Sequence, residues 1–258
     1  MFVVFVSHLA RPAETEAAAV ASVLGVTEYE ARLALVTPAP AVVLTTSSRD
    51  RANDTAARLR TRGHGVHVFD EEAFVPSDAM TKMDDFRLDG DGVRRVADGE
   101  LLAYGDVFAI LRAVHSSSSE VERPSAQRGL RADLIDMQRT PDAMRVVSKN
   151  AEREQVAYFF RRSGERPWIL RERHARYAGL GAERGPIAFG NFVLTVNRVR
   201  EAAPMSVYDD RLVRRRVAER VREDSMLKAT YKSSQDGVDL LAHLLALSIA
   251  NQGGSPYR

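Results

Sequence analysis

FVVFV at residues 2–6, AVVLTT at residues 41–46 and GVHVF at residues 65–69 are the three short runs that decide the fold of the first part of this chain. Each is rich in β-branched and aromatic residues, which is typical of a β-strand. The segments between them carry helical signals. The order therefore predicts a strand, two helices, a strand, a helix and a strand, with the helices on one face of a single sheet. We expect this βααβαβ module to occupy residues 1–70.

The helices of the module are bounded by residues that start or stop helices. Pro12 stands where a first helical turn tolerates proline, and Gly25 supplies the left-handed residue that ends that helix. Thr27 caps the second helix, and Gly63 ends the third before the last strand. These signals place a boundary at each end of the predicted elements.

The segments LGVTEYEAR at 24–32 and ANDTAARLRTRG at 52–63, with a proline break at 38–40 between them, resemble the C-terminal domain of ribosomal protein L7/L12. The ClpS-like adaptor fold shares that architecture. The resemblance implies a compact adaptor-type module whose exposed helical face binds a protein. In the ribosomal domain, lysines around the Leu-Gly turn engage translation factors. Residues 24–32 contain no lysine, so that role does not carry over.

From residue 71 onward the sequence predicts a linker followed by antiparallel strands. Residues 71–83 mix acids with proline and serine without periodicity, which predicts a linker. From residue 84 onward, Asp-Gly pairs in 89–92 and 98–99 predict the tight turns of an antiparallel meander. The tract YGDVFAILRAV at 104–114 resembles the W-x-D-I strand of bacterial PH-like domains, with tyrosine in place of tryptophan. The serine-rich stretch 115–125 predicts a loop.

Further strands and three helices complete the second region, residues 84–258. Strands are predicted at 155–160 and 168–170, and helices at 187–202, 209–224 and 237–250. The last helix is apolar and is interpreted as a docking helix rather than a membrane helix. The predicted fold class is α+β: a small βααβαβ module followed by an antiparallel β-containing domain, PH-like by resemblance, with C-terminal helices.

Charge is distributed unevenly along the chain. Residues 1–80 hold seven Arg against ten acids, whereas residues 153–222 hold sixteen Arg against eight acids. A basic stripe serves the phosphates of nucleic acid or an anionic membrane surface. Only four of the 37 basic residues are Lys, so arginine is the common cation throughout, and a solvated charged face is the simpler interpretation. The candidate anion or nucleic-acid contacts are Arg161, Arg162, Arg171, Arg173, Arg214, Arg215 and Arg216.

Four motifs suggest chemistry but lack parts that the chemistry needs. Residues 89–100 place acids at EF-hand positions one, three and twelve, but Arg94 stands where the loop needs glycine. Residues 225–228 have Ser-x-x-Lys spacing without a Lys-Thr-Gly partner. Residues 179–185 have two glycines at dinucleotide-loop spacing without the preceding apolar strand. Trp168, which has aromatic residues near it in sequence, suits base stacking or, more commonly, core packing. We expect no catalytic residue, metal or cofactor.

The leading hypothesis is therefore a non-catalytic interaction protein, adaptor or regulatory, with a protein partner. The alternatives are nucleic-acid or anionic-surface binding through residues 161–222, and an enzyme of unrecognised type whose site residues are distant in sequence. The chain has no cysteine, its N-terminal apolar run lacks a basic flank, and no window suits a spanning helix. A cytoplasmic protein without a membrane span is expected.

Overall fold

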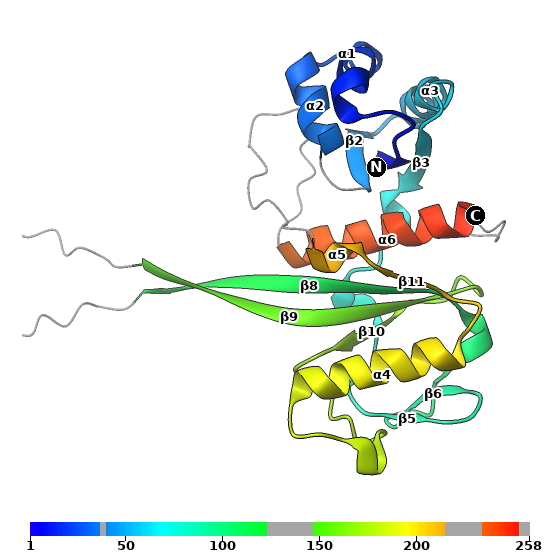
Figure 1. The fold of residues 1–258 in the computed structure, drawn as a ribbon, viewed down its shortest axis with the longest axis vertical. Coiled ribbons are helices and arrows are strands. Elements are labelled where there is room, and N and C mark those ends of the chain that lie inside the picture. The colour runs from blue at the N-terminus through cyan, green and yellow to red at the C-terminus, as the bar shows by residue number, and fades with distance from the viewer. Residues whose placement is uncertain (37–39, 123–146, 215–233, 253–258) are drawn as a thin grey trace, which may run out of the picture.

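The computed structural model describes residues 1–36, 40–122, 147–214 and 234–252. The N-terminal part has the predicted order of elements and forms one antiparallel sheet of strand order β2-β1-β3. Its elements are β1 Phe2–His8, α1 Ala13–Leu24, α2 Glu28–Val36, β2 Ala41–Thr46, α3 Arg49–Arg60 and β3 Gly65–Asp70. Helices α1, α2 and α3 cover one face of this sheet, as the sequence predicts (Figure 1).

The second part contains two sheets. The first is β5-β6-β7, and the second has the order β11-β8-β9-β10-β4, antiparallel in its centre and parallel at both edges. The strands of this second part are β4 Thr81–Lys82, β5 Phe86–Leu88, β6 Gly92–Arg95, β7 Leu101–Ala103, β8 Val107–Glu122, β9 Val147–Arg161, β10 Trp168–Arg171 and β11 Val207–Asp210. The helices of the second part are α4 Ala188–Ala202, α5 Arg211–Arg214 and α6 Ser234–Gln252. The α+β fold class predicted from the sequence is confirmed.

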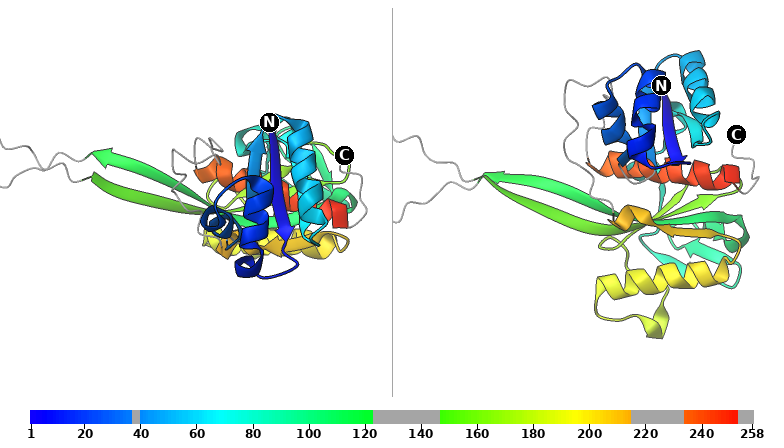
Figure 2. Two further views of the ribbon diagram at one scale, coloured as in Figure 1. Left: turned by 90° about the horizontal axis from the view of Figure 1, so that it is seen from above. Right: turned by 45° about the horizontal axis from the view of Figure 1, so that its top comes forward.

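The elements are stacked in layers that alternate helices and sheets (Figures 1 and 2). The alternation of side chains along a strand lets each sheet contribute to two cores. In β1, Val4 and Val6 face α1–α3, whereas Phe5 faces α6. In β9, Phe160 faces α6, whereas Phe159 faces α4 and the β5-β6-β7 sheet. Both sheets that touch α6 are therefore covered on their two faces.

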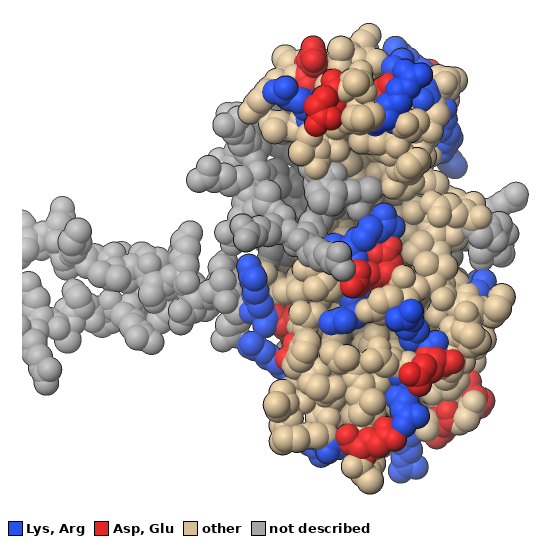
Figure 3. Space-filling view, in the orientation of Figure 1, with Lys and Arg blue, Asp and Glu red and all other residues tan. Residues whose placement is uncertain are grey.

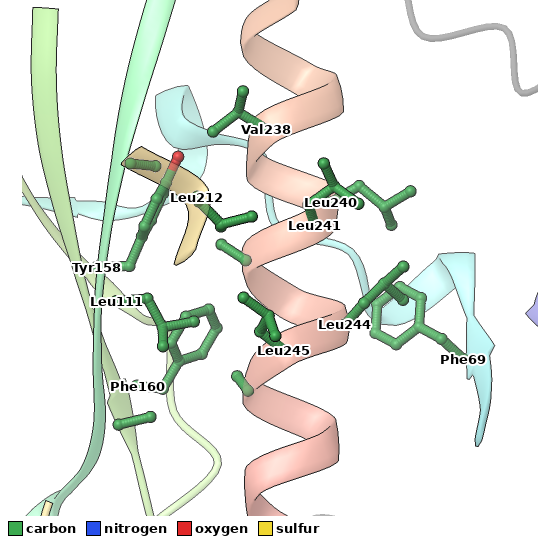
Figure 4. Close-up of a cluster of buried hydrophobic side chains, with 14 of the residues drawn as sticks. Phe69, Leu111, Tyr158, Phe160, Leu212, Val238, Leu240, Leu241, Leu244 and Leu245 are labelled. Carbon is green, nitrogen blue, oxygen red and sulfur yellow. The ribbon is translucent and has the colours of Figure 1, made fainter. Parts of the chain in front are cut away.

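Helix α6 lies between the two sheets and packs apolar side chains against both of them, although Asp239 and His243 interrupt its apolar surface. Figure 4 shows Leu244 beside Phe69 of β3, whereas Leu245 points toward Leu111 and Phe160 of the second sheet. The helix docks as the sequence predicts. No helix in the described residues has both the length and the apolar character that crossing a membrane requires.

Three expectations of local structure need correction or qualification. The serine-rich stretch that predicts a loop continues β8 as far as Glu122, because its backbone pairs with β9. The segment 71–83 holds β4 and the buried Ser77, Met80 and Met83, so it packs against the second part. The predicted helix 209–224 begins as strand β11 and helix α5, and its residues 215–224 lie outside the described residues.

One glycine allows a close approach of two backbones. Gly179 bridges Arg87 of β5, and a Cβ at Gly179 would lie 2.3 Å from the carbonyl oxygen of Phe86. We expect Gly179→Ala to lower the free energy of unfolding by about 1–3 kcal/mol, because backbone must shift to relieve this contact. Urea denaturation measures the change. Gly190→Ala is the control, since a Cβ there meets nothing within 4 Å, and equal stabilities of the two variants would refute the close-approach argument.

Candidate functional site

Three exposed large apolar side chains lie along α2. Tyr29, Leu33 and Val36 are 57%, 53% and 60% exposed. Their spacing of four and three residues places them on one helix face, which we call the α2 ridge. Ala31 and Leu35 lie on the opposite face and are buried in the N-terminal core. The ridge is therefore the outer face of a helix whose inner face is fixed.

Local hydrogen bonds hold the start of α2. The backbone N–H of Thr27 donates to Glu30 Oε2 at 2.9 Å, the Thr27 hydroxyl donates to the same oxygen at 2.8 Å, and the N–H of Glu30 donates back to Thr27 Oγ1. This is a capping box. The bonds from Thr27 lower the pKa of the Glu30 carboxyl. The guanidinium of Arg32 lies 5.7 Å from the ring centre of Tyr29. The cap and this cation–π contact define the geometry around the ridge.

Helix α2 carries two exposed acids and one exposed base. Glu28 and Glu30 lie in its first turn, and Arg32 follows them. The space-filling view shows acidic and basic side chains unevenly spread over this end of the molecule (Figure 3). Apolar side chains beside carboxylates favour a partner segment that is apolar and basic.

A buried polar cluster fastens α6 to the rest of the molecule. Asp239 is fully buried and accepts hydrogen bonds from the N–H of Ser77 (2.8 Å), its hydroxyl (2.6 Å) and the Tyr158 hydroxyl (2.6 Å). His115 Nε2 lies 3.1 Å from Asp239 Oδ1 and 2.7 Å from the Tyr158 oxygen. Burial alone raises the pKa of Asp239, but the bond from His115, its charge and the bonds from Ser77 and Tyr158 outweigh burial and lower that pKa. The carboxylate is therefore kept ionised inside the core.

A second polar chain ties the other end of α6 to the N-terminal sheet. Ser7 Oγ donates to the carbonyl of Gly65 at 3.2 Å and lies 3.0 Å from His67 Nε2, while the Asn251 side-chain nitrogen lies 3.0 Å from His67 Nδ1. All three bonds are satisfied when the Asn251 side-chain nitrogen donates to His67 Nδ1, His67 Nε2–H donates to Ser7 Oγ, and the Ser7 hydroxyl donates to the carbonyl of Gly65. A nucleophilic serine instead gives its proton to the histidine. The arrangement therefore favours a structural tie over an activated serine.

The structure places two of the candidate arginines in polar contacts at the base of the β9–β10 turn. Arg161 is 11% exposed at its side chain and donates to Asp106 at 2.7 Å, with further ion pairs to Glu100 and Glu165. Arg162 is exposed and donates to the carbonyl of Met205. The charge of Arg161 is thus balanced internally.

Arg171 and Arg173 belong to a second group of contacts, around Glu154. Arg171 donates twice to Glu154, which also contacts His174 and the N–H of Arg173. Burial raises the pKa of Glu154, but these contacts together lower it. Arg214 ends α5, and Arg215 and Arg216 lie outside the described residues. Among the described residues, Arg161 and Arg171 therefore lie in separate ion pairs, and the role of the seven arginines as nucleic-acid contacts stays a prediction.

The motifs that lacked parts in the sequence occupy ordinary structural positions. Arg94 pairs with Asp89 and Asp91, and Arg95 pairs with Glu100. Trp168 is fully buried in the core between the second sheet and α4, so the core-packing interpretation holds. Residues 225–228 lie outside the described part of the chain. Within that part, no group of three or more His, Asp or Glu side chains is placed to hold a metal ion.

Sequence reasoning missed the Asp239 cluster. Ser77 and Asp239 are 162 positions apart, and no local pattern links them. The signal that exists is weak: Asp239 and His243 interrupt the apolar run at 238–250. His243 proves fully enclosed, with its ring centre 5.1 Å from that of Phe160, and burial lowers its pKa.

The largest of the described cavities holds about 630 Å³ and lies between the segment 78–85 and the β6–β7 turn. Its walls alternate in charge, with Lys82, Arg95, Arg166 and Arg176 facing Asp78, Asp84 and Asp85. Neither the Asp239 cluster nor the His67 chain opens into any of the four cavities described. Comparisons of the chain with protein-family models, with curated proteins and with solved structures found no match.

Proposed function

We propose that this chain is a non-catalytic protein-interaction protein, adaptor or regulatory, that binds its partner through the α2 ridge. The observation that carries the proposal is the exposure of Tyr29, Leu33 and Val36, each more than half exposed, on a helix that is capped and fixed at its inner face. An apolar stripe left in water on a rigid element is a common form of protein-binding surface.

Two further points support this proposal. The resemblance of residues 24–32 and 52–63 to the L7/L12 C-terminal domain and the ClpS-like adaptors implies binding by an exposed helical face, and the resemblance of 104–114 implies a PH-like second region. The Asp239 carboxylate, whose pKa is lowered, and the Tyr158 hydroxyl, whose pKa is raised, are fully buried in contacts to each other and to Ser77 and His115, which leaves no room for a substrate. The absence of cysteine favours a cytoplasmic location.

Site-specific photocrosslinking in native lysate tests the proposal. The full chain carries a photoreactive amino acid at Leu33 or, as the matched control, at the exposed Arg58 of α3 in the same module. We expect one discrete protein adduct from position 33 and none from position 58. Because the ridge supplies the contact, Tyr29→Ser with Val36→Ser should reduce the adduct at least about tenfold, while stability changes by less than about 0.5 kcal/mol.

The adduct must also form when nuclease and raised salt are applied to the lysate before irradiation, because an apolar contact does not depend on phosphate charge. Equal adducts from positions 33 and 58, or an adduct indifferent to the ridge substitutions, would contradict binding through α2. The full chain is required because residues 1–80 alone leave Val3, Phe5 and Phe69 without the cover of α6.

A further inference from the structure

The loop that enters α4 and the first residues of α4 itself are exposed. All ten residues from 181 to 190 are exposed, among them Ile187 at 68% and Phe189 at 48%. The loop contains η4, Gly181–Glu183, and projects at the end of the molecule opposite to α1–α3 (Figures 1 and 2). We call residues 184–190, RGPIAFG, the apolar tip.

The base of the apolar tip is clamped by buried residues. The side chain of Asn191 is buried and bonds both polar groups of Gly185, accepting from its N–H at 2.7 Å and donating to its carbonyl at 2.9 Å. Before the tip, Tyr177 and Leu180 are buried in the second core, and the Tyr177 hydroxyl donates to the carbonyl of Glu172. Ile187 and Phe189 are therefore presented to solvent by a fixed backbone rather than by a loop free to fold inward.

The tip carries one exposed cation. Residues 171–190 hold four Arg against two Glu, but Arg171 pairs with Glu154 and Arg176 pairs with Asp85. Arg184 is exposed, and its side chain has no ion pair among the described residues. Glu183 is paired with Arg198, and Glu172 accepts the N–H of Gln155. A cavity of about 570 Å³ lies behind the tip, with Arg173, Arg184 and Glu172 among its lining residues.

We propose that the apolar tip docks on an anionic lipid bilayer, with Ile187 and Phe189 inserted below the headgroups and Arg184 against lipid phosphates. A projecting tip that presents two large apolar side chains beside a cation suits a planar interface with an apolar interior and negative surface. A folded protein partner at this position would need a pocket for both side chains. The inference is independent of the α2 ridge, which lies at the other end of the molecule.

Vesicle co-sedimentation of the full chain tests this proposal. The probes are vesicles of phosphatidylcholine with and without phosphatidylglycerol. We expect binding to the vesicles with phosphatidylglycerol and loss of binding at high salt, because surface attraction is screened. Ile187→Ser with Phe189→Ser should lower the partition coefficient at least about tenfold, since two large apolar side chains leave the bilayer. Arg184→Gln should lower it by a smaller factor.

The matched control is Met205→Ser with Val207→Ser. These residues are 78% and 47% exposed at the other end of α4, so the control removes similar apolar surface without touching the tip. The control should bind vesicles as the parent does. Absence of binding to vesicles with phosphatidylglycerol, or equal binding by the tip double variant and the parent, overturns the proposal.

A fluorescence measurement locates the tip directly. Phe189→Trp adds an indole at the tip, whereas Trp168, the one native tryptophan, is fully buried and serves as an internal reference. On addition of vesicles with phosphatidylglycerol we expect a blue shift and quenching by brominated acyl chains in Phe189→Trp, and neither in the parent. An unshifted spectrum in the presence of vesicles that sediment the protein would show that another surface binds and would reject the tip.

Discussion

Asp239→Ala is expected to lower the free energy of unfolding by about 3–5 kcal/mol, because removing one partner of a buried charged network leaves the others unpaired. The hydroxyls of Ser77 and Tyr158 and Nε2 of His115 lose their common acceptor in the core. Urea denaturation followed by circular dichroism measures the loss. Asp54→Ala, at an α3 carboxylate 70% exposed, is the control and should change stability by less than about 0.5 kcal/mol.

The same carboxylate gives the fold a predicted sensitivity to acid. Because the pKa of Asp239 is lower in the folded protein than in the unfolded chain, its stabilisation is complete above the ordinary carboxyl pKa. The contribution is lost as pH falls through the lowered pKa. Asp239→Asn should therefore flatten the dependence of stability on pH in the acid range. A loss with acid as steep in Asp239→Asn as in the parent would assign the sensitivity to other groups such as Glu154.

Trp168→Ala is expected to lower the free energy of unfolding by about 3–5 kcal/mol, because the largest fully buried side chain leaves a cavity. Trp168 lies in β10, paired with Phe159 of β9 on one side and Thr81 of β4 on the other. The cavity therefore opens where three strands meet. Chemical denaturation followed by far-ultraviolet circular dichroism gives the change without relying on tryptophan emission.

Trp168→Phe separates packing from hydrogen bonding. The indole Nε1 has no hydrogen-bond partner among the described residues, so phenylalanine removes volume without breaking a bond. We expect a loss of about 1–2 kcal/mol, well below that of alanine. Equal losses for the two variants would mean that the indole nitrogen has a partner whose loss, rather than the cavity, sets the cost.

Local chemistry is sufficient to predict the N-terminal part. Gly25, for example, has the left-handed backbone that its place after α1 requires, with φ of 73°. The capping box at Thr27 also lies where the sequence places a helix start. Each of these signals acts over a few residues, so it is visible in the sequence before any tertiary contact is known.

Pairing between distant segments explains what the sequence does not reveal. Strand β4 is two residues long and exists because Thr81 and Lys82 pair with β10. Serine lacks the apolar alternation of a strand, yet residues 116–119 continue β8 through their backbone bonds to β9. The Asp239 cluster likewise joins η2 (Ser77–Ala79), β8, β9 and α6, four elements that meet only in the folded chain. Such contacts have no local sequence signal.

The position of α6 between the two sheets has a consequence for synthesis on the ribosome. The N-terminal sheet can pair as soon as β3 has emerged, but Val3, Phe5 and Phe69 gain their cover only with α6, which follows every other described element in the chain. Until then the nascent polypeptide carries an uncovered apolar sheet face. Such intermediates aggregate readily, and we expect the newly made chain to depend on chaperones until α6 has been translated.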